Sequence, residues 1–196
     1  IILIALIAMA ALAPWLGTVD PQAISPIRRL RKPSETYWFG TDMLGRDVYS
    51  RVIYGARVSL SVGLFVALFA TLVGLVLGLV TGFVRWLDGI IMRIMDGLMA
   101  IPAILLAIAM VSLFRSSVWT VIIAITVPQV PGVVRLVRSI VLSVREEPYV
   151  EAAVTLGTST PKLLWRHVLP NTIAPMIVQG TFICASAILI EAILSF

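Results

Sequence analysis

The chain has 196 residues, of which 60% are hydrophobic and only 13% are charged, with a formal net charge of +5 and a mean hydropathy of +1.04. Because soluble domains carry about 25% charged residues, much of this chain needs lipid rather than water as its solvent. The basic residues stand between apolar runs, which favours membrane flanks over nucleic-acid binding. The single cysteine, Cys184, excludes an internal disulfide, and no metal-ligand spacing surrounds it.

Five apolar stretches follow one another along the chain, each near the roughly 20 residues that a membrane-spanning helix needs. They cover residues 1–17, 58–84, 97–114, 116–134 and 168–196. Backbone in lipid satisfies its own hydrogen bonds as helix, so the prediction is an all-α membrane protein, a polytopic helix bundle with about five visible spans. For the first stretch, Ala11-Leu12-Ala13 also resembles a signal-peptide cleavage site, but Pro14 and the later spans favour a retained helix.

Both ends of the chain fall inside apolar runs, at Ile1 and Phe196. We therefore expect a fragment cut at both ends, forming a single transmembrane domain over residues 1–196. Charge leaves its orientation open, because the polar segments 18–57 and 135–167 are both basic and fall on opposite sides of a five-helix bundle.

Two patterns inside the spans predict local features. Gly74, Gly78 and Gly82 repeat every four residues, which gives one smooth helix face and predicts close packing inside the bundle. Pro128 and Pro131 lie in the fourth stretch, where each proline removes a helix hydrogen bond. They either open a kink beside a pathway or shape the end of a span.

The polar segment 145–171 predicts two short helices at the membrane surface. Pro148 suits a first helical turn, with Glu146 and Glu147 beside the positive helix end. Gly157 is a natural stop, because glycine accepts the left-handed conformation that closes a helix. One predicted face carries Val150, Ala153, Val154 and Gly157, and another carries Glu147, Glu151 and Thr155.

The second predicted helix begins with Thr160 as its cap and Pro161 as its first residue. Pro170 then marks the turn into the last span. Such a helix-turn-helix presents acidic and small residues to water and lets a partner approach closely. The alternative is an ordinary connecting loop.

The same segment resembles the EAA loop of ATP-binding cassette (ABC) importer permeases. The matching positions are Glu151-Ala152-Ala153, Gly157 and His167-Val168-Leu169-Pro170. A second set of positions resembles the dipeptide, oligopeptide and nickel permeases of that family. It comprises residues 39–47, 50–51, 54–60, 91–93, 96, 102, 191–192 and 194–196. The likeness covers most of the chain after residue 39, while the first forty or so residues are uninformative.

The resemblance implies a type I ABC importer permease fold with six helices, five of them visible here. It implies that residues 145–170 form a cytoplasmic coupling loop and that the loop 18–57 faces outward. The ATPase-coupling residues would be Glu151, Ala152, Ala153, Gly157, Leu169 and Pro170. The implied setting is a bacterial inner membrane, with a second permease subunit, two ATP-binding subunits, an extracytoplasmic solute-binding protein and lipid as partners, and no nucleic acid. The solute stays open among dipeptides, oligopeptides, glutathione and nickel chelates.

An enzyme is not expected, because the sequence lacks a Walker A loop and gives its single histidine, His167, no catalytic neighbour. ATP hydrolysis is therefore assigned to a partner chain, and no cofactor or metal is expected in this one. The alternative function is an ion-gradient-driven secondary transporter or channel subunit, which would use charged residues within the spans. Only Glu191 qualifies, and it either lines the pathway or reaches interfacial water.

Charged residues before the second stretch form the remaining candidate site. Asp42, Arg46 and Asp47 either contact the solute-binding protein or fix a turn around Gly40 and Gly45. The sequence leaves these two alternatives open.

Overall fold

The computed structural model describes residues 2–114 and 117–194. The regular elements of these residues are helices. One isolated β-bridge pairs Thr41 with Asp47. The chain separates into two units, Ile1–Ser61 and Val62–Phe196. The helices are α1 (Ile2–Ala11), α2 (Val48–Phe83), α3 (Arg85–Ala100), α4 (Ala103–Leu113), α5 (Val118–Arg145), α6 (Pro148–Thr155), α7 (Thr160–Leu163) and α8 (Leu169–Leu194). Short 3-10 turns lie at Ala13–Trp15 and Pro26–Arg28, and a π-helical turn lies at Leu164–Val168. The all-α prediction is confirmed.

Helices long and apolar enough to cross a membrane cover Val48–Phe83, Val118–Arg145 and the continuous run Thr160–Leu194. The bent pair of α3 and α4 adds a fourth crossing if it counts as one span. At about 1.5 Å per residue, the 36 residues of α2 extend well beyond the roughly 30 Å of a bilayer core. Both α2 and α5 are longer than the apolar stretches predicted for them, because polar residues continue each helix past its apolar part.

Two of the predicted stretches differ from the described helices. Residues 1–17 give the ten-residue α1 and then the 3-10 turn Ala13–Trp15, because Pro14 lacks the N–H that a longer helix needs. Residues 97–114 do not form one straight helix, since α3 and α4 meet at an angle of 87°. Pro102 holds the preceding Ile101 in extended backbone (φ −94°, ψ 127°) and breaks the helix there. Ile1, Ser116 and residues 195–196, at the ends of three predicted stretches, lie outside the described residues.

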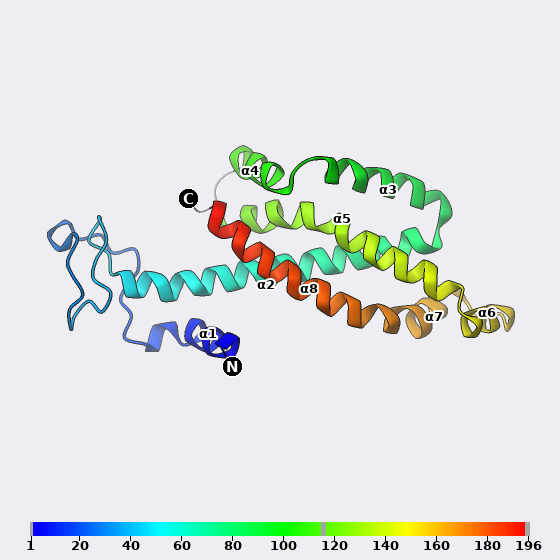
Figure 1. Cartoon of the computed structure of the whole chain (residues 1–196), viewed down its shortest axis with the longest axis horizontal. Helices are drawn as coiled ribbons and strands as arrows, with labels where there is room; N and C mark the ends of the chain where they lie inside the picture. The colour runs from blue at the N-terminus through cyan, green and yellow to red at the C-terminus, as the bar shows by residue number, and fades with distance from the viewer. Residues whose placement is uncertain (1, 115–116, 195–196) are drawn as a thin grey trace. The chain divides into compact units, whose positions relative to one another are not determined.

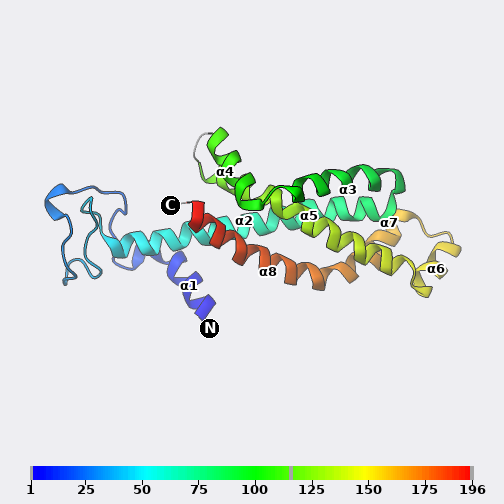
Figure 2. The same ribbon diagram turned by 45° about the horizontal axis from the view of Figure 1, so that its top comes forward.

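In the unit Val62–Phe196, α5 is the central helix. Figures 1 and 2 both show it between α3 and α8, with α6 and α7 at one end of these helices and α4 at the other. Its buried positions include Ile122, Ile125, Val133, Val137 and Val141. By contrast, only 11% of the most apolar part of the run Thr160–Leu194, which contains α8, is buried. The corresponding share for α5 is 50%. The core of the unit therefore lies along α5, and α8 presents most of its surface outward.

The glycine row of α2 packs against α5, as the four-residue spacing predicts. Each glycine faces a valine of α5: Gly74 faces Val133, Gly78 faces Val137 and Gly82 faces Val141. A Cβ added at Gly78 would lie 2.6 Å from the Val137 Cβ, a separation that close-packed helices cannot accept. The row therefore packs within the chain.

The prolines of the longer helices do not end them. Pro128 and Pro131 lie inside the continuous helix α5, so neither ends the fourth span. Pro170 does not mark a turn, which corrects the sequence-based expectation: α7 continues into α8 through the π-helical turn Leu164–Val168. A π turn leaves backbone groups outside the regular ladder, so Pro170, at the second position of α8, is accommodated without a break.

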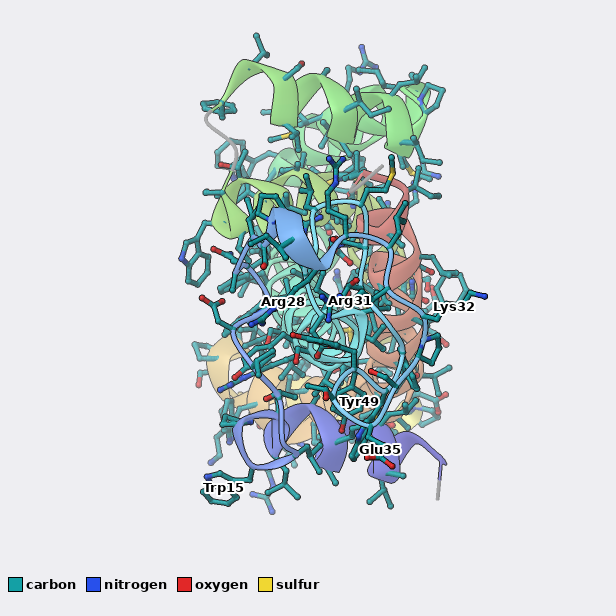
Figure 3. All side chains as sticks on the ribbon, turned by 90° about the vertical axis from the view of Figure 1, so that its left-hand side faces the viewer. Trp15, Arg28, Arg31, Lys32, Glu35 and Tyr49 are labelled. Carbon is teal, nitrogen blue, oxygen red and sulfur yellow. The ribbon has the colours of Figure 1, made fainter. Side chains whose placement is uncertain are left out.

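In the unit Ile1–Ser61, an irregular segment is folded on itself before α2. Thr41 is bonded to residues 28–31 of the same segment, because its N–H donates to the Arg31 carbonyl at 3.1 Å and its hydroxyl donates to the Arg28 carbonyl. The Arg28 guanidinium lies 5.9 Å from the centre of the Tyr37 ring. Figure 3 shows Trp15 and Lys32 directed away from the ribbon, and Trp15 is 84% exposed.

Candidate functional site

Helix α6 forms the predicted first helix of the segment 145–170, and its two ends are fixed as the sequence indicates. Glu147 is the N-cap residue in extended backbone, and Pro148 opens the helix. At the other end Gly157 has φ +77°. The Gly157 N–H donates to the Val154 carbonyl at 2.9 Å, and the Thr158 N–H donates to the Ala153 carbonyl at 3.0 Å. This pair of hydrogen bonds is the Schellman motif, which requires a left-handed residue at this position.

Buried side chains attach α6 to the bundle. Val150 is 1% exposed and Leu163 is 3% exposed, and both belong to the core cluster built around α5. The Asn171 side chain donates to the Tyr149 hydroxyl at 3.2 Å and to the His167 carbonyl at 2.6 Å. The Tyr149 and His167 rings lie 5.8 Å apart. One side of α6 is therefore held by the start of α8.

Much of the remaining surface of α6 is open. Glu151 and Ala152 are exposed, and among the described residues the Glu151 carboxylate makes no hydrogen bond or ion pair. Leu156 is 87% exposed and Val154 is 58% exposed. The predicted face of Val150 and Val154 is only partly buried. Val154 lies about 40° around the helix from Val150, and α6 is anchored along a narrow line. Acidic and apolar side chains thus stand together on the outer surface of α6.

A cavity of about 640 Å³ lies between α6 and the neighbouring helix ends. Glu151 and Thr155 line it from α6, Leu163 from α7, and Phe83 and Arg145 from the ends of α2 and α5. The Arg145 guanidinium donates to the Gly82 carbonyl at 2.6 Å and lies 5.2 Å from the centre of the Phe83 ring. The last residue of α5 is therefore in contact with the last turn of α2.

Two ion pairs join α3 to α5 and were not predicted from the sequence. Arg138 binds both carboxylate oxygens of Asp88, with Nε to Oδ1 at 2.6 Å and Nη2 to Oδ2 at 2.7 Å. One helical turn away, Arg135 Nη2 donates to Asp96 Oδ1 at 2.5 Å. The signal in the sequence was the pairing of two acids eight residues apart with two arginines three residues apart, because both spacings keep a pair on one helix face.

The candidate residues before α2 form a closed hydrogen-bond set. Asp42 accepts the backbone N–H groups of Leu44 and Arg46 on one oxygen and the guanidinium groups of Arg46 and Arg51 on the other, at 2.7–2.9 Å. Burial raises the pKa of Asp42, but these hydrogen bonds and the Arg46 charge outweigh it and hold the pKa well below its usual range. Gly45, at φ +76°, closes the turn.

Asp47 and Ser50 start α2. Asp47 Oδ2 accepts the Ser50 N–H at 2.9 Å and the Ser50 hydroxyl at 2.5 Å, and the Ser50 hydroxyl oxygen accepts the Val19 N–H at 2.9 Å. A carboxylate that accepts an N–H three residues into a helix is an N-cap. These contacts support a structural role for Asp42, Arg46 and Asp47, while their contact with a solute-binding protein stays a prediction.

The remaining candidates differ in position. Leu169 and Pro170 lie at the start of α8, beside the π-helical turn, and Ala153 packs against the core cluster. Glu191 lies near the other end of α8 and is partly buried. At about 1.5 Å per residue, α8 separates Glu191 by roughly 33 Å from Leu169. The structure thus brings the residues of the segment 145–170 together and leaves Glu191 apart from them.

Spanning helices joined by a polar helical segment define a polytopic membrane protein. Residues 52–196 match the family described as the binding-protein-dependent transport system inner membrane component. The chain belongs to this family of inner-membrane components, and its spanning helices agree with that location.

The curated relatives are similar over almost the whole chain. It is 57% identical over 188 residues to a protein of Sinorhizobium fredii named a probable peptide ABC transporter permease, which covers 96% of this chain and 65% of the relative. It is 44% identical over 197 residues to a dipeptide transport system permease protein of Alkalihalophilus pseudofirmus, covering 100% and 65%. It is 40% identical over 195 residues to a glutathione transport system permease protein of Escherichia coli, covering 98% and 64%. The chain spans just under two thirds of the length of these relatives.

Proposed function

We propose that this chain is a membrane-spanning permease subunit of an ATP-driven importer, and that α6 is the helix through which ATPase subunits act on it. The observation that supports this most strongly is the form of α6. Its inner side is anchored by the buried Val150, its end is fixed by the motif at Gly157, and its outer side presents Glu151, Val154 and Leu156. A short rigid helix with an open mixed surface suits docking of another protein.

The proposed solute is a peptide or a related small molecule. The support is the printed names of the relatives, which are peptide, dipeptide and glutathione permeases. The proposed assembly contains a second permease subunit, two ATP-binding subunits and an extracytoplasmic solute-binding protein. In this assembly the binding protein selects the solute, and the permease pair provides the path across the membrane.

The proposed orientation places residues 145–170 in the cytoplasm and residues 18–57 outside. We expect a cysteine at Ser34 to react with a membrane-impermeant thiol reagent added from outside, and one at Ser159 to stay unlabelled. Cys184 is replaced first in both variants. The opposite labelling pattern would overturn this orientation.

The coupling role is tested by Glu151→Lys and Gly157→Trp in the full-length transporter, reconstituted with its partner subunits. Glu151→Lys reverses a charge on the open surface of α6. Nothing lies within 4 Å of a Cβ added at Gly157, so Gly157→Trp acts through backbone strain at φ +77° and through bulk on the docking side. Both variants should reach the membrane and lose uptake driven by ATP. Normal ATP-driven uptake by both variants would contradict the proposed coupling role of α6.

A gradient-driven transporter or channel is distinguished in the same proteoliposomes. We expect uptake to persist when ion gradients are collapsed, provided that ATP remains available, and to require all of the partner subunits. Gradient-driven uptake by the full-length chain alone, without ATP, would refute an importer subunit.

A further inference from the structure

The last turn of α5 connects α6 to the corner between α2 and α3. α2 ends at Phe83 and α3 begins at Arg85, with Val84 alone between them. The last four carbonyl groups of a helix lack partners inside it. In α2 one of these is the Gly82 carbonyl, and the Arg145 guanidinium binds it at 2.6 Å. The same guanidinium lies 5.2 Å from the centre of the Phe83 ring, in cation–π range.

The connection from Arg145 to α6 is short and hydrogen-bonded. Only Glu146 and Glu147 separate α5 from α6. Both are bonded to the last turn of α5, because the Glu146 N–H donates to the Ser143 carbonyl and the Glu147 N–H donates to the Val144 carbonyl, each at 3.2 Å. A displacement of α6 therefore reaches the backbone of Arg145 without a flexible linker to absorb it.

The packing of α3 against α5 is also fixed by ion pairs. Arg138 and Arg135 join α5 to α3 through Asp88 and Asp96. The pair of Arg138 with Asp88 is bidentate, which fixes geometry as well as distance. α5 thus holds the end of α2 through Arg145 and holds α3 through these ion pairs.

We propose that Arg145 is a positioning residue that carries the movement of α6 to the cytoplasmic ends of α2 and α3. This inference depends on the proposed coupling role of α6. It adds a residue that lies before the EAA loop motif and touches neither ATP nor solute. Arg145 acts through the Gly82 carbonyl and the Phe83 ring, and its charge alone is insufficient.

The test uses the full-length transporter with its partner subunits in proteoliposomes, and it measures uptake and ATP hydrolysis together. Arg145→Gln should lower the uptake per ATP hydrolysed by about tenfold, within the range of about 5–150-fold that coupling between sites spans. Arg145→Lys should recover only part of this loss, because lysine keeps the charge and loses the planar group. The matched control is Arg93→Gln, which removes one exposed guanidinium from α3 and none of these contacts.

A double-mutant cycle separates a coupling role from a merely stabilising one. Phe83→Leu alone should lower the uptake per ATP hydrolysed, and it should add nothing in the Arg145→Gln background, because the two groups act as one contact. If Arg145→Gln does not assemble, Phe83→Leu carries the test, and an assembled Phe83→Leu transporter with normal coupling would overturn the proposal. Additive effects, normal coupling in Arg145→Gln, or an equal loss in Arg93→Gln would also overturn it. A wild-type transporter without ATP-driven uptake would instead refute the proposed function.

Discussion

Two polar segments of the chain, residues 40–51 and 145–170, are rich in charge, yet they use it in opposite ways. In the first, Asp42 binds two backbone N–H groups and two guanidinium groups, and Asp47 caps α2. In the second, Glu151 makes no hydrogen bond or ion pair among the described residues, and Leu156 is 87% exposed beside it. In the first segment the Asp42 carboxylate is fully bonded, and Asp47 Oδ1 is the only buried side-chain oxygen or nitrogen that lacks a hydrogen-bond partner among the described residues. The second segment leaves acidic and apolar groups available to a partner.

The largest expected effect separates the anchored side of α6 from its open side. Val150→Asp buries a carboxylate in the core and should destabilise the protein by several kcal/mol, because a buried unpaired charge is costly. Leu156→Asp changes a side chain that is 87% exposed and should leave thermal stability unchanged while lowering ATP-driven uptake. Thermal unfolding in detergent, measured beside uptake, checks both. Equal stability loss in the two variants would contradict the assignment of the two sides.

The second effect concerns residues 40–51, which we call the closed segment because Asp42 is bonded within it. Asp42→Asn keeps the size of the side chain and removes the charge that Arg46 and Arg51 bind. Because hydrogen bonds to charged groups contribute about 1.5–3 kcal/mol, amides of residues 40–51 should exchange hydrogen faster in this variant. ATP hydrolysis coupled to uptake should stay normal. Unchanged exchange would indicate that the Asp42 contacts do not hold the segment.

A smaller effect follows from the pKa of Asp42. Its pKa in the folded protein lies well below the unfolded value of about 3.9. The carboxylate therefore stabilises the segment at pH values above about 4, and this contribution is lost as the pH falls through the folded pKa. The protection of the amides of residues 40–51, measured as their exchange rate relative to an unfolded chain at the same pH, should stay high down to about pH 4 and fall below it. Asp42→Asn should abolish this pH dependence, and an identical profile in both proteins would contradict it.

The smallest effect is expected at the contact between α6 and α8. Tyr149→Phe removes the hydroxyl that accepts the Asn171 side chain at 3.2 Å and keeps the ring against His167. A partly exposed neutral hydrogen bond contributes about 0.5–1.5 kcal/mol. The unfolding temperature should therefore change by only a few degrees. A loss of folding would mean that α6 depends on this contact more than on Val150.

The sequence predicted the parts of the site that local chemistry determines. Pro148 and Gly157 mark the two ends of α6. They could be predicted because the fixed φ of proline and the left-handed backbone of glycine are properties of single residues. The spacing of Gly74, Gly78 and Gly82 likewise predicted close packing. Hydropathy did not reveal the break at Pro102, because an apolar average carries no information on backbone hydrogen bonds.

Contacts between distant residues were out of reach. Arg138 and Asp88 are 50 residues apart, and Arg145 and Gly82 are 63 residues apart, so only the packing of α5 against its neighbours brings them together. The sequence likewise did not predict which residues of α6 are buried. Helical periodicity gives a face its direction, while the width of the buried strip depends on what packs against it.

The contrast between the two segments is tested most directly by site-specific photo-crosslinking in the assembled full-length transporter. One crosslinking residue replaces Leu156 on α6, and a matched control replaces Met43 in the closed segment, where the side chain is 67% exposed. We expect the probe at Leu156 to crosslink to an ATP-binding subunit and the probe at Met43 not to do so. Absence of the ATP-binding subunit from the Leu156 product, or its capture by the Met43 probe, would contradict the proposal that α6 is the docking surface.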